Sequence, residues 1–159
     1  MRRSHRLPDG RVASREVIEH PGAVAIIPLV DDDHVCLIRN YRLAVQKWLL
    51  EIPAGTLEPG EPPAVTAMRE LAEETGYTAQ SLTPLCQMVF SPGILHERMH
   101  IFVATGLTPG ETRLEFGEQI DKEIMPLNEA LAMIECGEVE DAKTVAALLL
   151  YDRRRNLAR

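Results

Sequence analysis

The chain has 159 residues and a formal net charge of −7, from 24 acidic and 17 basic residues. This length fits one domain with a single core, and a hydrophobic share of 45% is usual for a globular chain. The acidic excess argues against nucleic acid or an anionic membrane as partners, but not against a phosphate substrate, since bound cations reverse the local charge.

Residues 1–21 form a polar N-terminal segment, which we separate from a domain over residues 22–159. The basic start, Met1 to Arg6, is not followed by an apolar region, so it lacks the pattern of a secretory signal. Pro8-Asp9-Gly10 predicts a turn, and Arg15–Glu19 predicts a short edge strand. The segment is therefore a candidate edge strand or dimer contact.

Ala23–Val30 is a continuous apolar run that predicts a buried strand, interrupted at Pro28. It is the longest such run and is far too short to span a bilayer, which argues against a membrane protein. Asp31–Asp33 predicts a turn, and Val35–Arg39 predicts the returning strand. We interpret the three aspartates as a solvated hairpin tip, because no spaced metal ligands follow them.

Three cysteines, Cys36, Cys86 and Cys136, stand far apart in the sequence and lack the spacing of metal ligands. An odd number of isolated cysteines is not the pattern of a disulfide framework. We therefore expect buried structural thiols in a protein of the reducing cytoplasm.

The returning strand ends with Arg39-Asn40-Tyr41-Arg42, which places two cations beside an aromatic ring. Trp48-Leu-Leu-Glu51-Ile-Pro-Ala54-Gly55 follows. A charged strand end is often only solvated, but arginine also suits a bidentate grip on phosphate. Tyr41 and Trp48 are either core packing or anchors of an interface, since interfaces favour aromatic residues.

Residues 62–76 predict a helix with two different faces. Pro62 and Pro63 stand at its start, where a missing N–H costs little, and Gly76 stands where a helix usually ends. At about 100° per residue, the other side of the helix from its apolar arc gathers the carboxylates of Glu70, Glu73 and Glu74. The mostly apolar arc comprises Ala64, Val65, Ala67, Met68, Leu71, Ala72 and Thr75.

Two interpretations of this acidic face compete. The glutamates are the solvated side of an amphipathic helix, or they bind a cation. Glutamates four residues apart repel one another by about a few tenths of a kcal/mol, and Arg69 is expected to pair with only one or two of them. Three converging carboxylates are what a hard divalent cation requires, so we favour a metal site.

Leu82–Phe90 and Met99–Ala104 predict two further strands, with the turn Ser91-Pro92-Gly93 between them. Glu97 lies in the connecting loop, where functional residues concentrate. An acidic loop follows, and one of its carboxylates is the alternative to Glu97 as a catalytic base. Its acidic residues are Glu111, Glu115, Glu118, Asp121 and Glu123.

Two helices complete the chain. Asn128 is predicted to cap a helix over Glu129–Cys136 that ends at the following glycine. Asp141 is predicted to cap the second helix, whose apolar face is Ala146–Tyr151. We interpret Arg153–Arg155 as cations favoured by the carboxyl end of that helix and not as a nucleic-acid patch.

The stretch from Gly55 to Tyr77 matches the pattern G-x5-E-x7-R-E-U-x-E-E-x-G-U at every fixed position, where U is a bulky apolar or aromatic residue. This pattern is the Nudix box, so the chain resembles the Nudix hydrolases, which cleave a nucleoside diphosphate linked to another group. The resemblance implies an α/β/α sandwich around a mixed β-sheet, which agrees with the order of strands and helices.

The same resemblance implies roles within the box. Glu70, Glu73 and Glu74 are expected to bind catalytic Mg2+, with Mn2+ as an alternative. Glu61 and Arg69 are expected to form a supporting ion pair that holds the helix against its loop. Gly55 and Gly76 are expected to support the site structurally.

The segments that flank the box, namely R-x-Y-R and L-E-I-P-A-G before it and S-P-G after it, resemble the ADP-ribose pyrophosphatase branch. Resemblance assigns Arg39 and Arg42 to the phosphates or terminal ribose. It assigns Glu51 and Pro92 to substrate binding, and the carbonyl of Ala54 to a metal. Glu97 is expected to activate water or to hold a further metal, and Glu73 to take part in catalysis through its metal.

We therefore predict a Mg2+-dependent hydrolase that converts ADP-ribose to AMP and ribose 5-phosphate. The alternatives are another substrate, such as a different nucleotide sugar, NADH or a dinucleoside polyphosphate, and a nucleotide-sensing module without activity. The resemblance also implies a homodimer, and the expected partners otherwise are the small-molecule nucleoside diphosphate substrate, with no nucleic acid and no membrane.

Overall fold

The computed structural model describes residues 1–114, 117 and 119–157. The helices are α1 (Pro63–Thr75), α2 (Leu127–Glu135) and α3 (Ala142–Leu157). The strands are β1 (Arg2–Arg6), β2 (Val12–Glu16), β3 (Ile18–Glu19), β4 (Ala23–Pro28), β5 (His34–Arg42), β6 (Lys47–Glu51), β7 (Ala54–Thr56), β8 (Thr78–Met88), β9 (Leu95–His96), β10 (Met99–Thr108) and β11 (Ile120–Pro126).

The middle layer of the molecule is built from two sheets. The first has the order β7-β4-β10-β8, in which β10 runs parallel to β4 and antiparallel to β8. The second has the order β11-β5-β6, and its strands are antiparallel. The first sheet is mixed, which confirms the expectation drawn from the order of elements.

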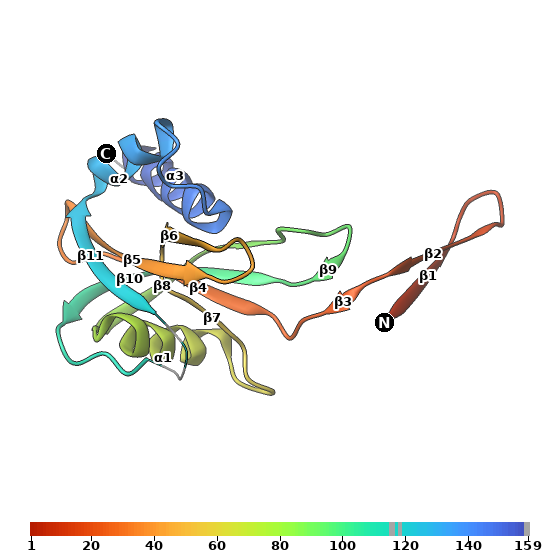
Figure 1. The fold of residues 1–159 in the computed structure, drawn as a ribbon, viewed down its shortest axis with the longest axis horizontal. Helices are drawn as coiled ribbons and strands as arrows, with labels where there is room; N and C mark the ends of the chain where they lie inside the picture. Colours follow the sequence, from red (N-terminus) through yellow and green to blue (C-terminus); the bar gives the residue numbers. More distant parts are fainter. Residues whose placement is uncertain (115–116, 118, 158–159) are drawn as a thin grey trace.

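Helices cover both sides of this layer, with α1 on one side and α2 and α3 on the other (Figure 1). The strand β4 explains why both sides are filled, because its side chains alternate between two hydrophobic clusters. Ala25 and Ile27 join the cluster that contains Leu148 of α3, whereas Ile26 packs with Leu71 of α1. The expected α/β/α sandwich is therefore confirmed.

Helix α1 begins and ends as predicted. Pro62 occupies the N-cap position, and Gly76 follows the last turn with a φ of 74°, a left-handed conformation that favours glycine. Its two faces differ from the expectation, however. Val65, which we placed on the apolar arc, is 53% exposed, whereas Glu74, which we placed on the acidic side, is buried.

The two C-terminal helices differ in how well their starts were predicted. Asp141 caps α3, since its Oδ2 atom accepts hydrogen bonds from the backbone N–H and the hydroxyl of Thr144 at 2.9 and 2.6 Å. The cap predicted for α2 is wrong, because that helix begins at Leu127, before Asn128, with Pro126 at its N-cap position. The backbone N–H of Leu127 instead donates to the carbonyl of Asp33.

Several local predictions need correction. The edge strand expected over Arg15–Glu19 is divided between β2 and β3. Asp121 and Glu123 lie in β11 and not in a loop, while Glu115 and Glu118 lie outside the described residues. The cysteines are not uniformly buried: the structure buries Cys36, half-buries Cys86 and exposes Cys136.

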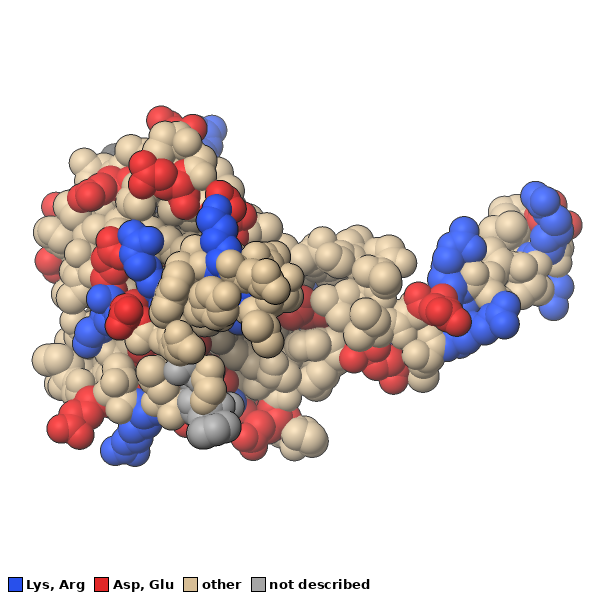
Figure 2. All heavy atoms as spheres, viewed as in Figure 1, with Lys and Arg blue, Asp and Glu red and all other residues tan. Residues whose placement is uncertain are grey.

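The N-terminal hairpin of β1 and β2 projects away from the body of the molecule (Figure 1). Strand β1 is exposed along its whole length. Arginine side chains gather on this hairpin (Figure 2), and they are Arg2, Arg3, Arg6, Arg11 and Arg15. Within the described part of the chain, no helix has both the length and the apolar character needed to cross a membrane.

Candidate active site

Strand β7 lies against the acidic side of α1. The backbone N–H of Ala54 donates a hydrogen bond of 2.9 Å to Oε2 of Glu74. A Cβ atom added at Gly55 would lie only 1.9 Å from Cδ of Glu70, so any larger residue there would displace that carboxylate from its position. Two glutamates of the helix are thus packed directly on the backbone of residues 54 and 55.

Arg69 provides a positive charge among these carboxylates. Its Nη1 atom donates to Glu70 at 2.8 Å and to Glu73 at 2.9 Å, and its Nη2 atom lies 3.5 Å from Glu61. Burial disfavours the charged guanidinium, but the surrounding carboxylates outweigh burial and raise the pKa of Arg69. Arg69 therefore pairs with two of the three helix glutamates, Glu70 and Glu73, as expected, and with Glu61 in addition.

The expected pair of Glu61 and Arg69 is present, but it is the longest of these contacts. Glu61 makes a shorter hydrogen bond, of 2.7 Å, with the hydroxyl of Thr66 in the second turn of α1. The hydrogen bond from Thr66, helped by Arg69, lowers the pKa of Glu61. Glu61 therefore ties the loop before α1 to both Thr66 and Arg69.

These residues fit a hard divalent cation by the chemistry of their donors. Glu70, Glu73, Glu74 and the carbonyl of Ala54 offer only oxygen atoms, which Mg2+ prefers. As the side chains of the described residues stand, no three acidic, histidine or cysteine groups converge into a coordination sphere. Arg69 instead compensates Glu70 and Glu73, so the guanidinium stands in for the positive charge that a metal would supply.

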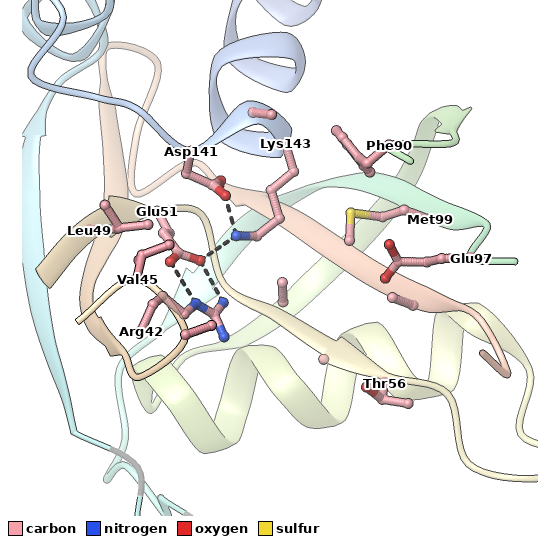
Figure 3. A pocket seen from close by; sticks show the side chains of 15 residues that line it. Arg42, Val45, Leu49, Glu51, Thr56, Phe90, Glu97, Met99, Asp141 and Lys143 are labelled. Carbon is pink, nitrogen blue, oxygen red and sulfur yellow. Dashed lines mark hydrogen bonds and ion pairs between the residues drawn. The ribbon is translucent and has the colours of Figure 1, made fainter. Parts of the chain in front are cut away.

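A cavity of about 450 Å³ lies beside β7, a volume suited to a small-molecule ligand. Figure 3 shows Arg42, Glu51, Asp141 and Lys143 close together, with Glu97 beyond them on the same cavity. Its lining residues are Ala23, Arg42, Ala44, Val45, Leu49, Glu51, Ala54, Gly55, Thr56, Phe90, Glu97, Met99, Asp141, Ala142 and Lys143.

The charged part of the cavity wall is organised around Glu51, whose side chain has no exposed surface. Its two oxygens accept bidentate hydrogen bonds from Nε and Nη2 of Arg42 at 2.7 and 2.6 Å. The hydrogen bonds from Arg42 to Glu51 raise the pKa of the guanidinium against the effect of burial. Lys143 also contacts Glu51, and its ammonium donates to Asp141 at 3.0 Å.

Glu97 lines another part of the cavity. It directly follows β9 and lines the cavity next to Met99 (Figure 3). Its side chain is largely buried, and one of its oxygens is 3.9 Å from Nδ1 of His20. Of the described alternatives, Glu111, Asp121 and Glu123 do not line this cavity.

The sequence-predicted substrate residues are not all brought together. Arg42 and Glu51 line the main cavity, but Arg39 does not; its Nε atom pairs with Glu123 of β11 at 2.6 Å. Pro92 lines a smaller neighbouring cavity that shares Glu97 with the main one. The structure therefore places Arg42, and not Arg39, on the wall of the main cavity.

Sequence reasoning missed Lys143 and the apolar lining residues Phe90 and Met99. Lys143 reads as an ordinary lysine in the first turn of a helix, and only the fold brings it to Glu51, 92 residues earlier in the chain. Asp141 was assigned to capping alone, and a cap that also lines a cavity has no distinguishing sequence signal.

Comparisons with known proteins agree with this geometry. A family profile described as NUDIX domain matches residues 19–148. The chain is similar to a protein of Bacillus subtilis (strain 168) named ADP-ribose pyrophosphatase, with 42% identity over 144 residues that cover 89% of this chain and 78% of the relative. A protein of Bacillus methanolicus named methanol dehydrogenase activator has the same identity and coverage. A solved structure described as an ADP compounds hydrolase matches with a TM-score of 0.80 and 32% identity, over 94% of this chain and 82% of that chain.

Proposed function

This chain belongs to the NUDIX domain family, and from that premise we propose that it hydrolyses ADP-ribose to AMP and ribose 5-phosphate. It is a Nudix pyrophosphohydrolase. The observation that carries the choice of reaction is the position of β7. The acidic side of α1 packs against this strand, and its residues 54–56 line the same cavity as Arg42 and Glu97.

Glu70, Glu73, Glu74 and the carbonyl of Ala54 are the groups that would hold Mg2+, with Mn2+ as the alternative. When bound, the metal neutralises the diphosphate and lowers the pKa of water. Arg69 holds the loop before α1 to the helix through its contact with Glu61. The buried Glu74 remains fixed by the N–H of Ala54, which holds β7 in register with the helix.

Arg42 is the residue that we propose to bind the substrate phosphates, since Glu51 fixes the orientation of its guanidinium. Phe90 and Met99 offer apolar surface to the organic part of the substrate. Glu97 accepts a proton from the attacking water while the water oxygen bonds to phosphorus. The P–O bond to the bridging oxygen of the diphosphate then breaks. One product carries the new oxygen, and the other leaves as the second phosphate monoester.

We propose that the enzyme acts as a homodimer. Trp48 is 43% exposed and packs edge-on against Tyr41 with ring centroids 5.5 Å apart. Leu43 in the adjoining turn is also exposed. An isolated two-stranded hairpin is at best marginally stable in water. The projecting β1–β2 hairpin therefore supports a dimer in which it packs against a second copy of the chain.

The three free cysteines support the reducing cytoplasm as the location of the protein.

The test is the value of kcat/KM for ADP-ribose, GDP-mannose, NADH and a dinucleoside polyphosphate, each with Mg2+. We expect ADP-ribose to be preferred. A competitor that exceeds ADP-ribose by about tenfold would show a transition-state preference of about 1.4 kcal/mol for the other compound and contradict the proposed substrate. Binding of these compounds without turnover of any would support the nucleotide-sensing alternative.

A further inference from the structure

The wall of the cavity contains a line of four charged groups: Arg42, Glu51, Lys143 and Asp141 (Figure 3). Glu51 lies at its centre and is completely buried. Lys143 is also buried, with 8% of its side chain exposed, and it reaches the centre from the first turn of α3. Burying two charges costs free energy unless they are paired and hydrogen-bonded, and here both conditions are met.

The cluster contains two cations and two carboxylates, and Lys143 contacts both of the carboxylates. Arg42 and Glu51 form a neutral pair, which by itself gives little net attraction for a diphosphate. Lys143 adds a second cation. Asp141 shares the ammonium of Lys143 at 3.0 Å, and its carboxylate also accepts the N–H and the hydroxyl of Thr144 at the N-terminus of α3, where the helix dipole favours an anion.

The geometry links the lysine to the arginine. Oε2 of Glu51 accepts from both Nη2 of Arg42 and Nζ of Lys143. Arg42 uses Nε and Nη2 for Glu51, so in the described structure its Nη1 protons point away from that carboxylate. A shift of Glu51 would therefore change the direction in which Arg42 presents its remaining donors.

We propose that Lys143 is a positioning residue of this reaction. It neutralises the buried Glu51, and through Glu51 it keeps Arg42 oriented toward the substrate diphosphate with its positive charge available. This inference rests on the proposed function, because it concerns how the same cavity binds the anionic part of the substrate.

The first test compares Lys143→Met with Lys47→Met. Both remove a lysine charge, but Lys47 pairs on the surface with Glu140, away from Glu51. We expect Lys143→Met to raise KM for ADP-ribose about tenfold with kcat changed less than about threefold, and Lys47→Met to leave both within about twofold. The dissociation constant of ADP-ribose, measured by calorimetry with EDTA present, should rise with KM.

The second test separates an action through Glu51 from a direct contact of the lysine with substrate. In a Glu51→Gln background no buried carboxylate is left to neutralise, so adding Lys143→Met should change KM by less than about twofold. A rise of about tenfold in both backgrounds would overturn the proposal. In the double variant residue 51 is neutral and Asp141 keeps its hydrogen bonds from Thr144. A tenfold rise in KM from Glu51→Gln to the double variant therefore overturns the proposal even if Lys143→Met alone does not fold.

The melting temperature of Lys143→Met shows whether the variant is folded under the assay conditions, so that a change in KM can be assigned to binding and not to unfolding. An unchanged KM in a folded Lys143→Met variant would overturn the proposal, whatever its melting temperature. Should the wild type cleave GDP-mannose, NADH or a dinucleoside polyphosphate in place of ADP-ribose, the proposed substrate fails. The same KM ratios, measured with the compound that is cleaved, then still decide the role of Lys143.

Discussion

Glu74 differs from the other two glutamates of its helix. It is only 4% exposed and accepts the N–H of Ala54, whereas Glu70 and Glu73 share Arg69. A buried carboxylate fixed to the strand that lines the cavity is well placed to hold a cation against the substrate. Helical periodicity alone grouped the three together, because it carries no information about which neighbouring strand covers which side chain.

Glu74→Gln should lower kcat by about 10³-fold or more, since a metal can supply several kcal/mol of charge stabilisation in the transition state. The amide oxygen of glutamine still accepts the Ala54 N–H, so the fold should persist. Without metal, the melting temperature should be equal to or above that of the wild type, because the substitution removes carboxylate repulsion.

Steady-state kinetics at saturating Mg2+ and thermal unfolding with EDTA measure these two effects. The matched control is Glu58→Gln, which changes an exposed carboxylate of the same box. Near-normal turnover of Glu74→Gln would refute the metal assignment.

Glu97→Gln should reduce kcat by about 10²–10⁴-fold with little change in KM, the pattern of a group that acts mainly in the transition state. The side chain is largely buried and lines the cavity, and glutamine preserves its size. Initial rates over a range of ADP-ribose concentrations check this split. A loss below about threefold would move the role to another acid, with the residues between 111 and 123 as the next candidates.

At the scale of secondary structure, local signals located α1 and both of its ends. The same signals missed β6 and β11, and they did so for a physical reason. Strand β6 mixes Lys47, Trp48 and the buried Glu51, and β11 mixes charged and apolar residues, so neither shows a clean alternation. Both strands are held by pairing with β5. The partner of β11 is far away in the sequence, so local signals do not indicate that pairing.

The end of α1 offers a test at this scale. Gly76→Ala should lower the free energy of unfolding by about 2 kcal/mol or more, because a Cβ there has both a positive φ and a contact of 2.5 Å with the carbonyl oxygen of Gly110. Gly60→Ala is the control, since Gly60 has a similar φ of 81° but nothing within 4 Å of the added atom. It should cost about 1 kcal/mol.

Chemical denaturation of both glycine variants gives the two free energies of unfolding. Equal losses for Gly76→Ala and Gly60→Ala would mean that the close approach of residue 110 does not constrain the helix end.

At the scale of the whole molecule, the body and the N-terminal hairpin differ in charge. The molecule as a whole carries −7, yet arginines gather on the projecting hairpin (Figure 2). The sequence indicated an N-terminal edge strand or dimer contact, but it did not indicate a hairpin that stands free of the body. Its two strands pair with each other. Whether such a hairpin also packs against the body of the molecule depends on its position in three dimensions, which the local sequence does not encode.

Trp48→Ala should weaken the proposed dimer, because a half-exposed tryptophan is a typical interface anchor. Sedimentation velocity at several concentrations should show a dimer for the wild type and a shift toward monomer for the variant. Leu149→Ala, which shortens a comparably exposed apolar side chain on α3, should leave the assembly unchanged. A wild type that sediments as a monomer at every concentration would contradict the dimer.

The most direct measurement of the central claim is a product analysis of ADP-ribose hydrolysis in ¹⁸O-labelled water. With Mg2+ the wild type should form AMP and ribose 5-phosphate in equal amounts, with the label in one of the two and none in free phosphate. Both products should disappear when EDTA removes the metal, and they should fall together in Glu74→Gln and Glu97→Gln. Formation of free phosphate, or full product formation in EDTA, would contradict the claim.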